Sequence, residues 1–516
     1  MGLREMINPI TPEFDDLVEK LLGKWKIPGL SIAIVHGSST YAKAYGIASF
    51  PSTPMTVDSL FSTCSTTKAF TAAALSLAID DSKSTPNPIS WSTPVSSLIR
   101  DDFVLSTPSA TAHTTIEDIL SHRSGLPGHF GVMAFAFPDE DLCTAVRKLR
   151  HLPLAYPPRT KFNYCNHMFM VASYLIEQIN GEDMGTTLKK RIWDPLGMSD
   201  TYFSVDEVKG IPTASERLVK GYTWNPETNS YHEEPYMNYT PITGTGAMVS
   251  NVLDYAKWLR ALVYQTGPIS PEGHTALRLP RTVIAQADWD NMLAPPGAYH
   301  LYTMGWFVDY YHGEQIYWHT GSWYGFGIMV GFLPARGFAF AMMGNTQNAR
   351  IAQLELYLYL IDGLIGKSGD GAAAEREAHV RRLGEKIQEM ERGFTESVEQ
   401  VIERLFPGLE RRLPHALALG AYAGKYEHPA YGDLVLRERD GKLVVDLTDR
   451  VLKKCLRFEH VSGEFFVTKY YTPGAEAVDP DYMKAEFYVD AKGVATELGI
   501  DMEPALGGKI WFKRAH

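Results

Sequence analysis

The chain has 516 residues, of which 45% are hydrophobic and 21% are charged, and its net charge is −11 at neutral pH. This composition is ordinary for a globular protein, and the length suggests two or three domains. The acidic balance and the absence of a dense Lys/Arg tract argue against nucleic acid or an anionic membrane surface as a partner. No apolar run approaches the length of a membrane span.

The N-terminal residues contain neither an apolar stretch nor a small-residue cleavage site, so no secretory signal is expected. Free thiols in a reducing compartment explain the few cysteines most simply, and we expect a cytoplasmic protein. His122, His129 and His167 lack ligand spacing with a carboxylate or cysteine partner, so neither a metal nor another cofactor is expected. The four cysteines are Cys64, Cys143, Cys165 and Cys455.

The predicted elements begin with an amphipathic helix over residues 12–25, followed by two strand-like segments joined by His36-Gly-Ser-Ser39. Helical patterns dominate from about 114 to 262, where Thr115 is expected to cap a helix that glycine and proline stop. Strand patterns then return, and a final helix is expected over 350–365. This order predicts an α+β fold, an antiparallel sheet flanked by helices with an inserted helical subdomain. The expected strands are 30–35, 40–45, 304–308, 315–319, 325–333 and 337–343.

The last part of the chain has a different character. Residues 366–371 have the composition of a flexible linker, and a charged helical stretch follows them. Short alternating strands with turns, such as Asp440-Gly441, fill the remainder and predict a small antiparallel β-barrel or sandwich. We therefore expect a first domain over 1–366, a linker with a charged helix over 367–411 and a barrel over 412–516.

One motif by itself suggests a chemical role. Ser65-Thr-Thr-Lys68 opens an Ala/Leu-rich run, 69–79, that is typical of a buried helix. Residues three apart share a helix face, so the lysine amine is expected beside the serine hydroxyl. A neighbouring amine can take the serine proton or stabilise the alkoxide, which makes the pair a candidate nucleophile for acyl transfer. About one such motif is expected by chance in a chain of this length.

Two further motifs follow in order, Tyr164-Cys-Asn166 and His319-Thr-Gly321. Together with Ser65-x-x-Lys68, they resemble the serine β-lactamase and penicillin-binding-protein superfamily, in its class C β-lactamase-related branch. The resemblance extends over about residues 15–365. Four other segments contribute to it, namely 27–35 (IPGLSIAIV), 120–127 (LSHRSGLP), 195–201 (PLGMSDT) and 331–337 (GFLPARG).

The resemblance implies a role for each motif residue. Ser65 would be the nucleophile, Lys68 would supply positive field and a proton route, and Tyr164 would be the general base and acid, with its phenolate favoured by nearby cationic charge. Asn166 would orient Lys68 or a substrate amide. The backbone N–H groups of Ser65 and Ser322 would form an oxyanion hole, and Gly321 would let the substrate backbone run close to its strand.

His319 departs from the lysine of β-lactamases and moves the expectation toward D-aminopeptidases, carboxypeptidases and esterases. Histidine is mostly neutral at pH 7, so a lysine at this position should improve the use of carboxylate-bearing substrates. Trp323 and Tyr324 are expected to line a pocket for an apolar acyl group. Trp306 and Trp318 are expected in the core, because residues of a strand alternate between faces.

For several other residues we expect a structural role rather than a chemical one. Cys64 and Cys165 are expected to be buried and inert, and His122 to belong to a structural turn. Residues 80–103 and 128–138 are expected to wall the pocket. The segment from Tyr422 to Gly432 is similar to the opening of a lipocalin-like domain, which could bind a ligand, cap the site or mediate oligomerisation.

The sequence thus predicts a serine hydrolase that forms an acyl-enzyme at Ser65 and cleaves an ester or amide of a small molecule or short peptide. Two alternatives stay open. In one, the acyl group passes to an alcohol or amine acceptor, for which the same residues serve. In the other, the protein binds a ligand without catalysis. A homo-oligomer is also left open.

Overall fold

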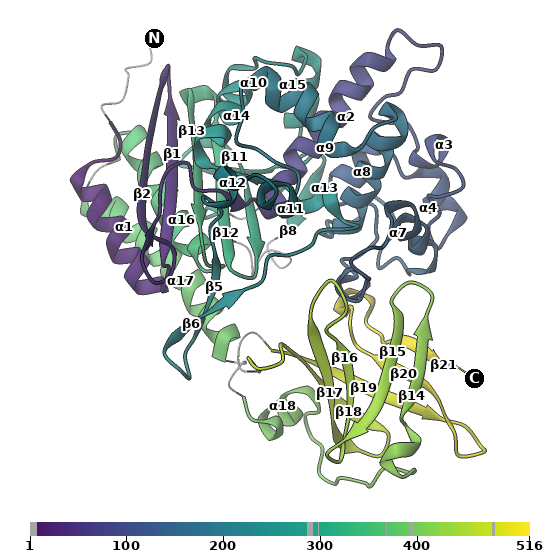
Figure 1. Cartoon of the computed structure of the whole chain (residues 1–516). Helices are drawn as coiled ribbons and strands as arrows, with labels where there is room; N and C mark the ends of the chain where they lie inside the picture. Colours follow the sequence, from purple (N-terminus) through teal and green to yellow (C-terminus); the bar gives the residue numbers. More distant parts are fainter. Residues whose placement is uncertain are drawn as a thin grey trace.

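The computed structural model describes residues 8–285, 293–297, 299–367, 369–392, 396–476 and 480–515. In this part of the chain nine strands form one antiparallel sheet, ordered β3-β2-β1-β13-β12-β11-β10-β9-β8 (Figure 1). The two ends of the first domain meet inside it, where β1, Gly29–His36, pairs with β13, Phe338–Gly344. The other strands are β2 Ser39–Ser49, β3 Thr53–Pro54, β8 Thr282–Ala285, β9 Tyr299–Tyr302, β10 Phe307–Tyr311, β11 Glu314–Trp323 and β12 Phe326–Leu333.

Helices cover both faces of this sheet, which explains why its central strands are almost wholly apolar. In β1, Ile32 and Ile34 pack into the hydrophobic cluster of one face, whereas Ala33 and Val35 pack into the cluster of the other. Helices α1, Pro12–Trp25, and α16, Ala349–Leu364, lie on the first face. Helices α14, Val252–Tyr264, and α2, Thr67–Ser82, belong to the second.

The predicted helical subdomain lies between the two sets of strands. Its helix α5 begins after the Thr115 cap, as expected, but it ends at Leu120, five residues before the glycine expected to stop it. The hairpin of β5, Gly221–Asn225, and β6, Ser230–Glu234, was not predicted. A short pair, β4 Phe61–Ser62 with β7 Val249–Ser250, leads to the site. The other helices are α3 Val95–Leu98, α4 Pro108–His113, α5 Ile116–Leu120, α6 Phe130–Ala134, α7 Leu142–Lys148, α8 Asn166–Asn180, α9 Met184–Leu188, α10 Asp194–Leu196, α11 Val205–Lys209, α12 Pro212–Ser215, α13 Thr243–Gly246 and α15 Pro271–Arg278.

The C-terminal part is a closed antiparallel barrel, one of the two forms that the strand pattern predicted, and it lies below the sheet domain in Figure 1. Closure is made by β14 and β21, which pair Tyr426 with Arg514. Helix α18, Val398–Leu405, precedes it. The barrel strands are β14 Gly424–His428, β15 Gly432–Arg439, β16 Lys442–Leu447, β17 Lys454–Ser462, β18 Phe465–Tyr471, β19 Asp481–Val489, β20 Ala495–Ile500 and β21 Ile510–Arg514.

The charged helix of the expected linker is α17, Asp370–Arg392, and it packs on the sheet domain. Val380 is buried in the cluster that includes α1 and α16, and Leu383 packs against the same cluster. A Cβ atom at Gly384 would lie 2.5 Å from the Trp25 ring, so this glycine permits the close approach. The helix is therefore attached to the first domain.

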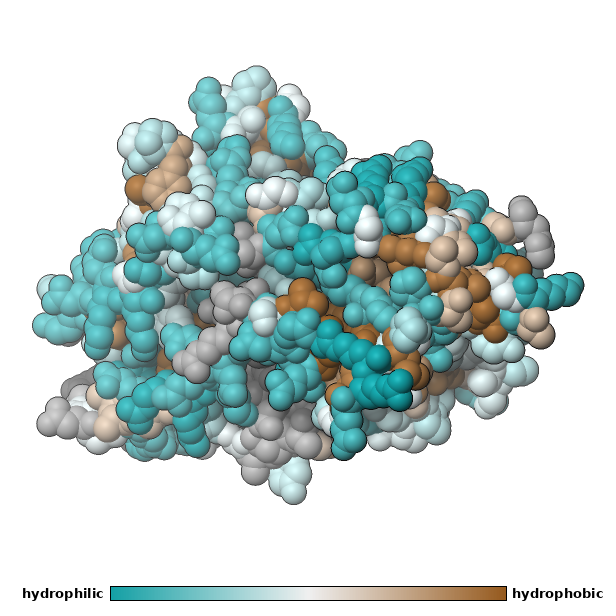
Figure 2. Space-filling model, turned by 90° about the horizontal axis from the view of Figure 1, so that it is seen from below, coloured by the Kyte–Doolittle hydropathy of each residue, from teal (hydrophilic) through white to brown (hydrophobic). Residues whose placement is uncertain are grey.

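The surface seen from below is largely hydrophilic, with hydrophobic residues gathered toward the right of the view (Figure 2). The barrel contributes exposed hydrophobic side chains, among them Leu413, Phe465 and Tyr488. Within the residues that the structure describes, no helix combines the length and apolarity needed to cross a membrane.

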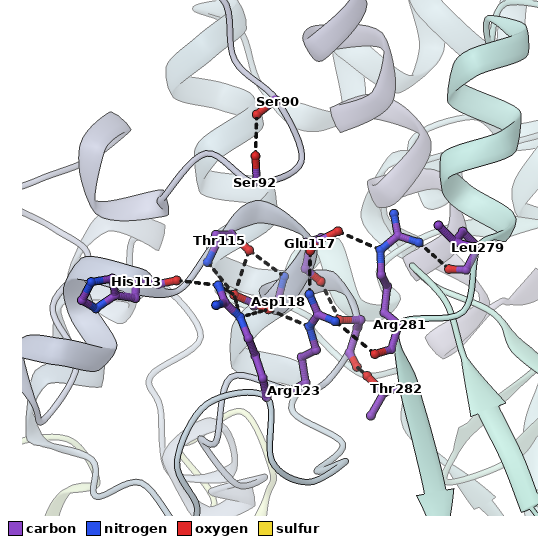
Figure 3. Close-up of polar contacts among 12 residues, drawn as sticks. Ser90, Ser92, His113, Thr115, Glu117, Asp118, Arg123, Leu279, Arg281 and Thr282 are labelled. Atoms are coloured by element: carbon purple, nitrogen blue, oxygen red, sulfur yellow. Dashed lines mark hydrogen bonds and ion pairs between the residues drawn. The ribbon is translucent and has the colours of Figure 1, made fainter.

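An ion network around the buried carboxylate of Asp118 joins the helical subdomain to the sheet (Figure 3). The Asp118 side chain is fully buried and accepts hydrogen bonds from Arg123 Nε at 2.6 Å and Arg159 Nη2 at 2.8 Å. It also completes the capping box of α5 with Thr115. Glu117 accepts from Arg281 Nε at 2.7 Å, immediately before β8. The network thereby fixes the turn that follows α5.

We predict that Asp118→Asn lowers the free energy of unfolding by about 3 kcal/mol, because two arginines lose their shared carboxylate. Burial raises the pKa of Asp118, but hydrogen bonds from Arg159 and Thr115 and the charge of Arg123 outweigh it and hold the pKa below 3.8. The stability that ionised Asp118 contributes is present at pH values above its ordinary pKa. It is lost as pH falls through the pKa of Asp118 in the folded protein. Urea denaturation at pH 7 and pH 3 should show the variant's deficit shrinking in acid.

The matched control is Asp101→Asn, which changes an exposed carboxylate nearby. It should leave stability within about 0.5 kcal/mol of the parent. An Asp118→Asn variant as stable as this control would contradict the assignment of the network as a structural anchor.

Candidate active site

Ser65 lies in a one-turn 3-10 helix, Cys64–Thr66, immediately before α2. Cys64 has a φ of 49°, in the left-handed region that costs energy for a residue other than glycine. Thr66 holds the turn from the other side, because its hydroxyl donates to Thr63 O at 2.8 Å and lies 2.7 Å from the Tyr255 hydroxyl. These contacts fix the backbone around Ser65.

Lys68 is fully buried, and its amine lies beside Ser65 as the helical spacing predicted. Lys68 Nζ donates to Ser65 Oγ at 3.0 Å and to the Thr245 carbonyl at 3.0 Å. The amine also lies 4.9 Å from the centre of the Tyr164 ring. Burial lowers the pKa of Lys68 to about 7, because charge is costly where water is excluded. A neutral amine beside a serine hydroxyl is therefore available near pH 7.

Tyr164 is partly buried, and its ring lies 4.2 Å, centre to centre, from the ring of His122. Burial raises the pKa of Tyr164 above its ordinary value of 10, although its hydrogen bond with Ser65 acts in the opposite direction. The expected phenolate is thus disfavoured, because desolvation dominates. His122 Nδ1 accepts from the Cys165 N–H at 3.0 Å. This contact fits the structural role expected for the turn of His122.

Asn166 begins α8 and lines the same cavity as Ser65 and Tyr164. Its side-chain oxygen is buried and accepts no hydrogen bond from any residue that the structure describes. Among the described residues, Lys68 is hydrogen-bonded to Ser65 and to the Thr245 carbonyl, and the role of Asn166 in orienting Lys68 or a substrate amide stays a prediction.

The second half of β11 leaves one edge open toward Ser65. Strand β10 pairs with β11 only as far as Trp318, whereas β12 pairs with it through Trp323. Gly321 lies on this edge, and a Cβ atom there would come within 2.3 Å of the Thr63 carbonyl. The glycine therefore permits the strand to approach the turn of Ser65. That Gly321 also lets a substrate backbone run close to this strand stays a prediction.

His319 is buried and donates through Nδ1 to the Thr320 carbonyl at 2.7 Å. The neutral ring then accepts at Nε2, which lies 3.1 Å from the Tyr302 hydroxyl. Burial and the nearby Lys68 lower the pKa of His319 to about 3. No cation stands at this position near neutral pH, in contrast to a lysine.

The cavity at Ser65 has a volume of about 240 Å³ and brings together most of the predicted site residues. Gln347 Nε2 donates to Ser322 Oγ at 3.1 Å beside it. Burial lowers the pKa of Arg350 to about 10, so this residue remains a cation at neutral pH. The lining residues are Ser65, Met133, Tyr164, Asn166, Tyr239, Ile242, Thr245, Phe307, His319, Thr320, Ser322, Trp323 and Arg350.

The aromatic residues of the sequence predictions divide between the cavity and the core. Trp306 and Trp318 are buried in the core, as predicted, and Trp323 lines the cavity. Tyr324 lies outside it, with its hydroxyl 3.1 Å from Lys454 Nζ of the barrel. Among the described lining residues, Met133 comes from the predicted wall 128–138 and none comes from 80–103, whose predicted place is taken by 239–245.

Sequence reasoning missed Arg350, Tyr239 and the Thr245 carbonyl. In the sequence, the glycine-rich segment 244–246 indicates only the approach to a helix. In the structure its backbone carbonyls bind the catalytic helix, since Thr71 Oγ1 donates to Gly244 O at 2.7 Å. No side-chain pattern signals a carbonyl contact of this kind.

The family model described as Beta-lactamase matches residues 14–361. The chain belongs to the beta-lactamase family. A model described as a domain of unknown function, DUF3471, matches residues 410–514. An unguisins hydrolase, ungD', of Aspergillus campestris is 38% identical over 519 residues, which cover 98% of this chain and 92% of that protein.

Two solved structures share the fold of this beta-lactamase family member. The octameric penicillin-binding protein homologue of Pyrococcus abyssi is 20% identical with a TM-score of 0.60, and the match covers 97% of this chain and 99% of that one. The D-amino acid amidase of Ochrobactrum anthropi SV3, complexed with L-phenylalanine amide, is 21% identical with a TM-score of 0.56. That match covers 69% of this chain and 99% of the amidase.

We predict that acylation of Ser65 becomes faster as pH rises through about 7, because the amine of Lys68 loses its proton there. Lys68→Arg should lower the acylation rate by about 100-fold or more and remove this inflection, since a guanidinium stays charged. Stopped-flow acylation between pH 5.5 and 9 measures both effects. Lys83→Arg, at the exposed end of the same helix, should keep the parent profile. An inflection retained in Lys68→Arg would assign it to another group.

We also predict that Gly321→Ala lowers kcat at least tenfold, because the added methyl displaces the turn of Ser65. Displacements of about 1 Å can cost about 100-fold in rate. Steady-state kinetics and thermal melting check this expectation. Gly23→Ala, with no atom within 4 Å of its added methyl, serves as the control. Parent-like kcat in Gly321→Ala would show that the approach of β11 to the turn does not matter.

Proposed function

We propose that the protein is a serine hydrolase that forms an acyl-enzyme at Ser65 and cleaves an amide bond of a small peptide-like molecule. The observation that supports this most is the 3.0 Å contact between Ser65 Oγ and the amine of Lys68, whose pKa burial lowers to about 7. A hydroxyl in hydrogen-bond contact with an amine that loses its proton near pH 7 forms an activated nucleophile.

In the proposed acylation, Ser65 Oγ bonds to the substrate carbonyl carbon while its proton passes to Lys68 Nζ. The carbonyl oxygen becomes an oxyanion, which the backbone N–H groups of Ser65 and Ser322 stabilise. The open edge of β11 supports this role for Ser322, because β10 does not pair with it there. Fixed donors of this type are each worth about 100-fold or more in rate.

The intermediate collapses when the bond from carbon to the leaving nitrogen breaks. The leaving amine takes a proton from the phenol of Tyr164, and the ammonium of Lys68 restores the proton of Tyr164. Burial supports this order, because it keeps Tyr164 a neutral phenol rather than a phenolate. Water then attacks the acyl carbon, and its proton passes through the same groups to Ser65 Oγ as the bond from that oxygen to the acyl carbon breaks. The acid is released and Ser65 is regenerated.

The cavity favours an amide substrate with an apolar acyl part. Met133, Ile242 and Phe307 supply apolar wall, while the buried oxygen of Asn166 is placed to accept a substrate N–H. Arg350 supplies the one cationic side chain among the described lining residues that stays charged well above pH 7. The relative named as an unguisins hydrolase makes unguisins the first compounds to test.

We place the enzyme in the cytoplasm, where its four cysteines would remain reduced. In the structure all four are free thiols, and Cys64 and Cys165 are buried. The Pyrococcus abyssi homologue is octameric, which supports a homo-oligomer as the assembly to test.

The deciding experiment is intact mass spectrometry after treatment with a fluorophosphonate, followed by turnover assays. We expect one adduct on the parent protein and none on Ser65→Ala. The assays compare unguisins, D- and L-amino-acid p-nitroanilides, p-nitrophenyl esters and a cephalosporin, and we expect amides to be cleaved. Ser109→Ala is the matched control, since Ser109 Oγ lies 3.5 Å from His113 Nδ1 on the surface.

An adduct that persists unchanged in Ser65→Ala would refute the nucleophile assignment. If the parent protein cleaves none of these compounds but passes an acyl group from a thioester to an added alcohol, it is an acyltransferase instead.

A further inference from the structure

A second cavity, of about 100 Å³, lies beside that of Ser65 and is walled by both parts of the chain. The sheet domain contributes residues 234–237, at the end of β6, and residues 323–324, at the end of β11. The barrel contributes residues 451–454, which lead into β17, and Thr472, which follows β18. Trp323 lines both cavities, so the two spaces adjoin the same side chain.

The barrel wall of this cavity is held firmly on the sheet domain. The backbone N–H of Val451 donates to the Ala136 carbonyl at 2.9 Å, and that of Leu452 donates to the Ala134 carbonyl at 3.3 Å. Arg450 reinforces the contact, because its guanidinium donates to Phe135 O at 3.1 Å and lies 3.7 Å from the Phe137 ring. These acceptors belong to the wall that carries Met133.

A second tie fixes the aromatic side of the cavity. Lys454 is buried and donates to the Tyr324 hydroxyl at 3.1 Å, with its amine 4.5 Å from the centre of that ring. The same amine lies 5.0 Å from the Tyr470 ring of the barrel. The orientation of Tyr324, next to Trp323, therefore depends on the barrel.

Much of the lining is apolar or aromatic, and its charged members are Glu234, Lys453 and Lys454. Apolar surface comes from Met237 and Trp323 of the sheet domain and from Val451 and Leu452 of the barrel, and a bulky uncharged group fits against this part of the wall. The cavity volume is several times the roughly 10–15 Å³ that one water needs, so the cavity can hold several waters. An aliphatic or aromatic side chain could displace these waters from the apolar walls. Such displacement favours binding in proportion to the apolar area covered.

We propose that this second cavity is a subsite for a bulky apolar or aromatic side chain of the substrate, at a residue remote from the bond that Ser65 attacks. The proposal rests on the proposed peptide-type function and assigns the barrel a direct part in substrate selection. A substrate that fills both cavities must extend past Trp323, so single amino-acid amides reach only the first.

Binding to the full-length Ser65→Ala protein tests the subsite without requiring turnover. The probes are acetylated pentapeptide amides with alanine throughout except for one phenylalanine, placed at each position in turn, and the all-alanine peptide. In isothermal titration, one position of phenylalanine should correspond to the first cavity. At a second position, two or more residues away, phenylalanine should bind at least tenfold more tightly than alanine does in the all-alanine peptide.

Two variants that would fill the second cavity test whether this cavity causes the preference. Each is made separately in the Ser65→Ala protein. Leu452→Trp enters the cavity from the barrel and Met237→Trp from the sheet domain, so a folding failure of one leaves the other. Each should reduce the distal preference to less than twofold. Leu413→Trp, at a half-exposed leucine of the C-terminal part, is the matched control and should keep it.

A distal preference that is absent, or that survives both filling variants, would overturn the subsite. The fluorophosphonate adduct and its loss in Ser65→Ala are measured separately, so failure of the hydrolase assignment is distinguishable. Distal selectivity in binding without any adduct on the parent protein would leave the subsite standing and refute the nucleophile.

Discussion

The active centre depends on one constraint, the complete burial of the Lys68 amine against the hydroxyl of Ser65. Burial removes the solvation that normally keeps a lysine charged, and the pKa falls to about 7. The Thr245 carbonyl holds the amine in place while adding no negative charge that would restore the cation. The same desolvation keeps Tyr164 protonated and His319 neutral, so the proposed proton route starts from groups that carry little charge.

The geometry around Ser65 comes from the meeting of distant segments. Strand β11 approaches the turn of Ser65 closely because Gly321 has no side chain, and its edge is open because β10 stops pairing at Trp318. An unpaired strand edge usually invites association, yet here it faces a cavity, where its N–H groups can serve a ligand. The pairing pattern of the sheet therefore also sets the geometry of the candidate active site.

The barrel belongs to the active-site neighbourhood. Its residues 450–452 bind the segment 134–137, which continues from the wall that carries Met133. Lys454 fixes Tyr324 in turn. Under the proposed subsite, a change in the barrel would alter substrate choice without a contact to Ser65, because the two cavities share Trp323.

The sequence by itself determined the α+β class, the small antiparallel C-terminal β domain and the pairing of Ser65 with Lys68, because these follow from local periodicity and from helical spacing. It also placed Trp306 and Trp318 in the core, since strand residues alternate. Only the tertiary structure decided the protonation of Tyr164, the partner of Tyr324 and the presence of Arg350 at the site. Those properties depend on desolvation and on contacts between segments hundreds of residues apart, which no local pattern encodes.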